Sequence, residues 1–194
     1  MLKTKIIAAD LQNLTDARYF AAWLVEYMSY NLSNPDTDLA KVKEIMDWVE
    51  GPISVAQYTG LEDTNGINAQ LEALSIDHLL LGPYASDDLI NSDWQVLQTV
   101  LLDEEIDSLR SDRTYVAQSN QSFSDFTAEK KKTLGELCSS HSIYLDCGFV
   151  AGDIDEILNL GITGLVLRGG EEEKVGVKSY EDLDKIFEAL ELDD

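Results

Sequence analysis

Residues 144–190 decide the fold: YLDCGFVAGDIDEILNLGITGLVLRGGEEEKVGVKSYEDLDKIFEAL. A short apolar run at 143–145 ends in a glycine-bearing loop at 146–148, and residues with helical apolar spacing follow. A second apolar run at 164–167 ends in the loop 168–170, and a second helical pattern follows. The stretch therefore predicts two strand–loop–helix units, with glycines where each strand ends.

The same alternation runs through the whole chain. Helical patterns separate eight short apolar runs, at 5–9, 27–30, 53–57, 78–81, 95–102, 114–117, 142–145 and 164–167. Helices are predicted at 16–25, 38–49, 67–74, 103–110 and 128–139, whereas the segment 86–90 offers barely two helical turns. Eight strands favour an α/β fold in which residues 1–194 form a single small (β/α)8 TIM barrel with a degenerate fourth helix. A doubly wound open sheet is the alternative.

Two motifs near the ends of the chain resemble the phosphoribosylanthranilate isomerase family of tryptophan biosynthesis. That family ends with a Ser-Gly-Val-Glu loop followed by Pro-Gly-x-Lys-Asp. This chain has Gly-Gly-Glu-Glu at 169–172 and Val-Gly-Val-Lys-Ser at 175–179, at matching spacing. Near the start, Asn-Leu-Thr-Asp-Ala at 13–17 resembles the family's Asn-Leu-Glu-Asp-Ala. The resemblance implies a divergent member that spans the whole chain.

The charge of the chain excludes several classes of partner. It has 14 Lys and Arg against 37 Asp and Glu, a formal net charge of -23. Such a surface repels phosphate backbones, so we expect no nucleic-acid partner and no anionic membrane partner. An acidic surface is typical of a solvated face, and salt adaptation is a second explanation.

The few cysteines and histidines point to a cytoplasmic protein without a metal. Cys138 and Cys147 are the two cysteines, no basic apolar leader precedes the first strand, and a reducing compartment is expected. His78 and His141 lie far apart without metal-binding spacing, so we expect neither a metal nor another cofactor. We expect Cys147 to pack rather than act as a nucleophile. The sequence does not indicate an oligomeric state.

The resembled family converts an aldose into a ketose by an Amadori rearrangement, and this chain lacks both of its proton-transfer groups. The family's general base is a cysteine at the end of the first strand, where this chain has Ala9 followed by Asp10. The family's general acid is an aspartate closing the sixth strand, where this chain has Gln118, which cannot release a proton at useful pH. Asp10 is a candidate substitute base and Asp146 a candidate substitute acid, whereas an aspartate a few residues before a helix is more often a helix cap or a loop hydrogen-bonding residue.

This chain keeps some of the substrate-binding groups of the resembled family and lacks others. The loop at 31–38 contains two aspartates and no Lys or Arg, where the family has a basic residue for the anthranilate carboxylate. The loops after the seventh and eighth strands keep the glycines Gly148, Gly169 and Gly170, which allow backbone N–H groups to approach a phosphate. Arg168 adds guanidinium donors, unless it forms a surface ion pair with Glu171 or Glu172.

These observations leave three hypotheses about function. The first is a divergent barrel that binds a small phosphorylated or anionic metabolite without the standard isomerase reaction. The second is a genuine phosphoribosylanthranilate isomerase, an intramolecular aldose–ketose isomerase that uses Asp10 as its base. The third is a non-catalytic, partner-binding barrel, which a mouth filled by Tyr84 or Phe149 would favour.

Overall fold

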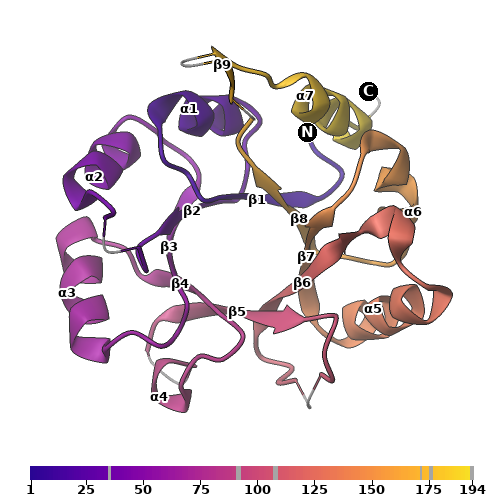
Figure 1. Cartoon of the computed structure of the whole chain (residues 1–194), viewed down its shortest axis with the longest axis horizontal. Coiled ribbons are helices and arrows are strands. Elements are labelled where there is room, and N and C mark those ends of the chain that lie inside the picture. The colour runs from indigo at the N-terminus through magenta and orange to yellow at the C-terminus, as the bar shows by residue number, and fades with distance from the viewer. Residues whose placement is uncertain (35, 91–92, 107–108, 171, 175–176, 193–194) are drawn as a thin grey trace.

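The computed structural model describes residues 1–34, 36–90, 93–106, 109–170, 172–174 and 177–192. Eight parallel strands close into a barrel in chain order, and the first strand pairs with the last over five residues (Figure 1). The predicted (β/α)8 barrel is confirmed, and the doubly wound open sheet is wrong because an open sheet leaves two unpaired edge strands. The strands are β1 (Lys5–Ala9), β2 (Tyr27–Asn31), β3 (Ile53–Tyr58), β4 (His78–Leu81), β5 (Gln95–Leu101), β6 (Thr114–Ser122), β7 (Ser142–Gly148) and β8 (Gly164–Arg168).

Helices cover most of the outer face of the barrel (Figure 1). They are α1 (Leu14–Ala22), α2 (Leu39–Asp47), α3 (Thr64–Leu74), α4 (Asp87–Ile90), α5 (Ala128–Ser140), α6 (Ile154–Asn159) and α7 (Glu181–Leu190), with the short 3-10 turns η1 (Phe123–Asp125) and η2 (Ala151–Asp153). A two-stranded hairpin, β9 (Glu172–Lys174) and β10 (Val177–Lys178), follows β8. The degenerate fourth helix is confirmed, because α4 has four residues.

The helix predicted at 103–110 is wrong. Within the described residues between β5 and β6, no helix is present. Hydrogen bonds to other parts of the chain replace the helical ones: the Asp103 carboxylate accepts the Ser119 hydroxyl at 3.0 Å and the Asn120 N–H at 3.3 Å. At the other end of the connection, the Arg110 N–H donates to the Tyr115 hydroxyl at 2.9 Å. Tertiary contacts thus outweigh the helical propensity of this segment.

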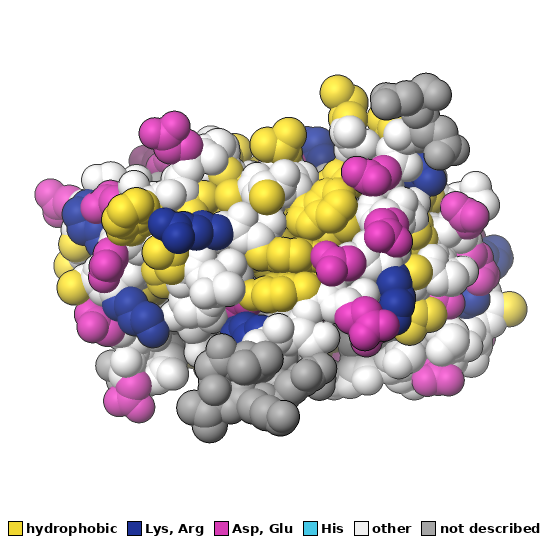
Figure 2. All heavy atoms as spheres, turned by 90° about the horizontal axis from the view of Figure 1, so that it is seen from above, with side chains coloured by type: hydrophobic (Ala, Val, Ile, Leu, Met, Phe, Trp, Pro, Cys, Tyr) yellow, Lys and Arg dark blue, Asp and Glu magenta, His cyan; other side chains and the backbone are white. Residues whose placement is uncertain are grey.

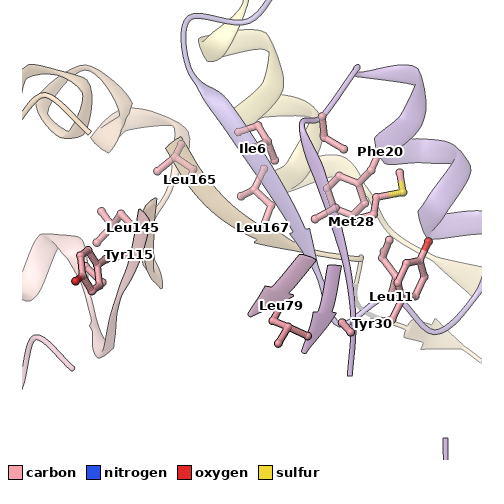
Figure 3. Close-up of a cluster of buried hydrophobic side chains, with 14 of the residues drawn as sticks. Ile6, Leu11, Phe20, Met28, Tyr30, Leu79, Tyr115, Leu145, Leu165 and Leu167 are labelled. Atoms are coloured by element: carbon pink, nitrogen blue, oxygen red, sulfur yellow. The ribbon is translucent and has the colours of Figure 1, made fainter. Parts of the chain in front are cut away.

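Side chains alternate between the barrel interior and the helical layer, as the strand period of two requires. One buried cluster fills the interior and contains Ile7, Ala9, Val55, Leu80, Leu97, Val116, Tyr144 and Val166. The larger cluster lies between sheet and helices, where Ile6, Phe20, Met28, Leu165 and Leu167 pack together (Figure 3). Because Val166 faces inward, Arg168 two residues later also belongs to the inward face, at the carboxyl end of β8.

The first and last helices meet through aromatic side chains. Tyr19 of α1 stacks on Tyr180 with ring centroids 4.2 Å apart, and Trp23 stacks on Phe187 of α7 at 4.6 Å. Apolar side chains gather in the centre of this side of the molecule, among acidic ones (Figure 2). These contacts hold α1 and α7, the first and last helices, together where the barrel closes.

Candidate functional site at the barrel mouth

The structure brings four of the predicted site residues together at the carboxyl ends of the strands. Arg168 ends β8, Asp146 lies near the end of β7, Gln118 lies on β6, and Asp10 directly follows β1. Since β1 and β7 are the neighbours of β8 in the closed sheet, the carboxylates of Asp10 and Asp146 come within reach of the Arg168 guanidinium.

Arg168 binds both carboxylates. Its Nη1 donates to Asp146 Oδ1 at 2.6 Å and its Nη2 to Asp146 Oδ2 at 2.9 Å, which is a bidentate pair. Its Nε donates to Asp10 Oδ2 at 3.1 Å. These contacts use three of the five guanidinium N–H groups, and the Arg168 side chain remains 46% exposed. The side chains of Glu171 and Glu172, the partners predicted for a surface ion pair, lie outside the described residues.

The two carboxylates of this cluster stabilise the positive charge of the Arg168 guanidinium. Hydrogen bonds from Arg168 to Asp146 raise the pKa of the guanidinium despite the opposing effect of burial, and the Asp146 and Asp10 charges add to the rise. One guanidinium between two carboxylates leaves the cluster net negative. Both oxygens of Asp146 already accept N–H donors, including Gln118 Nε2 at 3.2 Å. Asp146 is therefore engaged by both Arg168 and Gln118.

Asp10 has an unusual backbone conformation. Its φ is 56°, in the left-handed region that a non-glycine residue rarely adopts. Its N–H faces the Ser29 hydroxyl on β2 at 3.4 Å, and its carboxylate is committed to Arg168. The turn after β1 thus directs Asp10 toward the β8 end of the barrel mouth.

The three predicted phosphate-loop glycines pack closely against atoms of the protein itself. A Cβ at Gly169 would overlap the Asp16 carboxylate, and a Cβ at Gly170 would overlap the Ser179 carbonyl. At Gly148 an added Cβ would lie 2.9 Å from the Ser122 hydroxyl. The missing side chains therefore have a packing explanation, and a phosphate at these loops stays a prediction.

Asp16 is a residue whose role the sequence did not reveal. Its side chain is buried, and it accepts Asn13 Nδ2 at 2.7 Å, Lys178 Nζ and the Tyr180 hydroxyl. Asp16 and Lys178 come from the two motifs that resemble the isomerase family, 162 positions apart. That shared origin was the signal that could have predicted their contact.

A cavity adjoins the loop that carries Asp10. It has a volume of about 220 Å³, and its apolar part includes Leu11, Val42 and Ile45. Polar side chains of the loop after β2 also line it, among them Asp36 and Asp38. Lys41, in the first turn of α2, supplies a cation that the loop at 31–38 lacks, and the sequence analysis missed it because it lies beyond the loop.

The other candidate residues, Cys147, Tyr84 and Phe149, make contacts within the protein itself. Burial and then the Asp146 charge raise the pKa of the Cys147 thiol to about 12, so it is protonated at neutral pH and packs against the core. Tyr84 is 62% exposed and donates to Glu104, while Phe149 packs against the core outside the barrel.

Across the described residues, no group of three or more His, Cys, Asp or Glu could hold a metal ion. Nor does any helix there have the length and apolar character to cross a membrane.

Solved structures with a closely similar backbone include phosphoribosylanthranilate isomerases. That of Thermus thermophilus has a TM-score of 0.74 and 18% identity, over 96% of this chain and 98% of its own. A second, in complex with reduced 1-(o-carboxyphenylamino)-1-deoxyribulose 5-phosphate, has a TM-score of 0.72 and 12% identity, over 96% of this chain and 98% of its own. This chain has the fold of the phosphoribosylanthranilate isomerases. The predicted resemblance is confirmed at that level.

The same fold also occurs in a protein with a different activity. Thiamine phosphate pyrophosphorylase from Pyrococcus furiosus has a TM-score of 0.58 and 14% identity, over 97% of this chain and 94% of its own. No protein-family model and no curated protein sequence matches the chain. Because one barrel architecture supports several activities, the function has to be argued from the mouth residues.

Proposed function

We propose that this protein binds a small metabolite with a phosphate or another anionic group at the barrel mouth, and that it does not catalyse the isomerisation of phosphoribosylanthranilate. The observation that carries the proposal is the Arg168 cluster. Arg168 keeps N–H groups beyond the three it gives to Asp10 and Asp146, and its side chain is partly exposed. A ligand phosphate or carboxylate accepts such donors well, and these remaining N–H groups, not the net negative charge of the cluster, would hold it.

The same cluster argues against the standard isomerisation. Asp10 and Asp146, the substitute base and acid, are both ion-paired to Arg168. General acid and general base groups each contribute roughly 100- to 10,000-fold to rate, so a mouth without free groups for both would be very slow. The cavity beside Asp10 offers room for the rest of a small ligand.

A titration of ribose 5-phosphate against the purified protein tests the binding proposal, with ribose as the uncharged control. We expect the phosphate ester to bind more tightly than ribose. An Arg168→Met variant should lose that preference, whereas Lys41→Met should lower the affinity less. Equal binding of the two sugars, or a preference that survives Arg168→Met, would refute a role for Arg168 as the anion-binding group.

One observation favours the alternative of a genuine isomerase using Asp10. The left-handed backbone of Asp10 is a strained conformation, and strain of this kind clusters at functional sites. Turnover of phosphoribosylanthranilate that disappears in Asp10→Asn would support this alternative over our proposal.

A further inference from the structure

The helical layer is incomplete on one side of the barrel. The strands of a parallel barrel are normally covered by helices on their outer face. Here β4 is followed only by the four-residue α4, and the described part of the connection from β5 to β6 contains no helix. Figure 1 shows the resulting gap in the outer layer between α4 and α5. The outer face of β5 therefore lacks a covering helix, and its outward side chains Val96 and Val100 are only partly buried.

A groove of about 380 Å³ lies at this gap. Apolar side chains contributed by the loop after β4, by α4, by β5 and by the connection after β5 line it: Pro83, Ile90, Val100, Ile106 and Leu109. Tyr84, which is 62% exposed, also lines it. The groove has the size of a small binding site and is open along the outside of the barrel.

The charged side chains of the groove are mainly acidic. Asp87, Glu104 and Glu105 line it together with one cation, Arg110. Arg110 forms an ion pair with Asp112 at 2.8 Å, which offsets its charge. A groove lined by both apolar and acidic side chains complements a partner surface that carries apolar and basic side chains.

We propose that this groove docks an amphipathic helix from a different protein, with an apolar face and flanking Lys or Arg residues, at the position of the missing helix. The apolar face would cover the groove, and the basic residues would pair with Glu104 and Glu105. A second copy of this chain fits poorly, because each copy has a net charge of -23 and presents the same acidic groove. Helix-in-groove docking of this kind is a common mode of peptide recognition.

A fluorescence-anisotropy titration with a labelled 18-residue Leu/Lys peptide of helical period tests the proposal, at about 150 mM salt to screen nonspecific attraction. The same residues in scrambled order serve as the peptide control. An Ile106→Ser/Leu109→Ser variant should bind the helical peptide at least ~10-fold more weakly, since apolar contacts at the centre of an interface dominate affinity. Val150→Ser, which changes a 65% exposed side chain on the loop after β7, should stay within about twofold of the wild type.

A second pair of variants tests the charge complementarity and leaves the apolar side chains of the groove in place. Glu104→Gln/Glu105→Gln should weaken binding by roughly threefold and reduce its salt dependence. Glu181→Gln/Asp182→Asn on α7 removes the same charge elsewhere and should have a smaller effect. Equal binding of the scrambled peptide, unchanged affinity in Ile106→Ser/Leu109→Ser, or equal losses from the two charge variants would overturn the proposal.

Discussion

Arg168 sets the chemistry of the barrel mouth, because its guanidinium binds carboxylates from two other strand ends. Asp10 and Asp146 lie 136 positions apart in the sequence, yet both are ligands of the same side chain. A cation held in this way is fixed in position, and its remaining donors have a defined direction. Preorganised donors of this kind are the basis of the anion-binding role that we propose for Arg168.

Replacing Arg168 by Met should destabilise the protein by about 2 kcal/mol. Removing one partner of a buried ion pair costs 3–5 kcal/mol, and the half-exposed position of Arg168 reduces this. Urea unfolding at pH 7 measures the change. Adding Asp146→Asn to the Met variant should restore part of the loss, because it removes one of the two carboxylates left without their shared counter-ion. No recovery in the double variant would contradict this account.

Gly169→Ala should destabilise the protein by roughly 1–3 kcal/mol, because the new methyl group would displace the buried Asp16 carboxylate. Gly66→Ala on α3 is the matched control, since a Cβ there meets nothing within 4 Å. That control should be neutral or stabilise by up to ~1 kcal/mol, as helix propensity favours Ala over Gly. Thermal or urea unfolding of both variants separates the two effects, and a harmless Gly169→Ala would show that the Asp16 packing is loose.

At the scale of elements, the loop between β3 and α3 depends on one carboxylate. Glu62 accepts the Thr59 hydroxyl at 2.6 Å and the Gly60 N–H at 2.8 Å. Burial opposes the ionised form, but hydrogen bonds from Ser33, Thr59 and the backbone outweigh it and lower the pKa of Glu62 to about 2. The ionised side chain thus holds the loop in shape.

This shift predicts a specific acid dependence of stability. The folded-state pKa lies below the ordinary value of 4.5, so the contribution is complete above about pH 4.5 and is lost as the pH falls toward 2. Glu62→Gln should cost roughly 1–2 kcal/mol at pH 7 and flatten the fall in stability between pH 4.5 and 2. Urea unfolding as a function of pH checks this, and a wild-type slope retained in Glu62→Gln would contradict it.

Strand positions followed from the sequence, whereas the connection after β5 did not. Eight short, nearly continuous apolar runs marked the strands, because burial on both faces leaves a strong local pattern. The segment 103–110 also had a helical pattern, but Asp103 bonds to the Ser119 hydroxyl and Arg110 N–H to the Tyr115 hydroxyl. Such partners lie on β6, so no local pattern could have predicted them.

The residues of the candidate site could be selected from the sequence, but the ion pairs between them could not be predicted from it. The resemblance to the isomerase family selected Asp10 and Gln118, and position at a strand end added Asp146 and Arg168, since the ends of parallel strands meet at one face. That Arg168 binds both aspartates depends on barrel closure between β8 and β1 and on the backbone turn at Asp10. Both are tertiary features, so the ion pair between Asp10 and Arg168 could not be predicted from the sequence.

At the scale of the whole molecule, the net charge of -23 should destabilise the compact state by self-repulsion. Salt screens this repulsion, so the melting temperature should rise by about 5 °C between roughly 50 mM and 1 M KCl. Differential scanning calorimetry measures it. A melting temperature that falls with KCl would instead show that the ion pairs of the molecule dominate over its excess of acidic groups.

This barrel has the fold of the phosphoribosylanthranilate isomerases, and we propose that it does not share their reaction. Backbone similarity extends over 96% of the chain, while the groups at the mouth are committed to one another. The most direct test is a fluorescence assay of phosphoribosylanthranilate consumption by the purified protein, with Asp10→Asn and Gln118→Asp assayed in parallel. We predict no consumption above the uncatalysed rate by the wild type. Consumption by the wild type that Asp10→Asn abolishes would contradict the claim and identify an isomerase with Asp10 as its base.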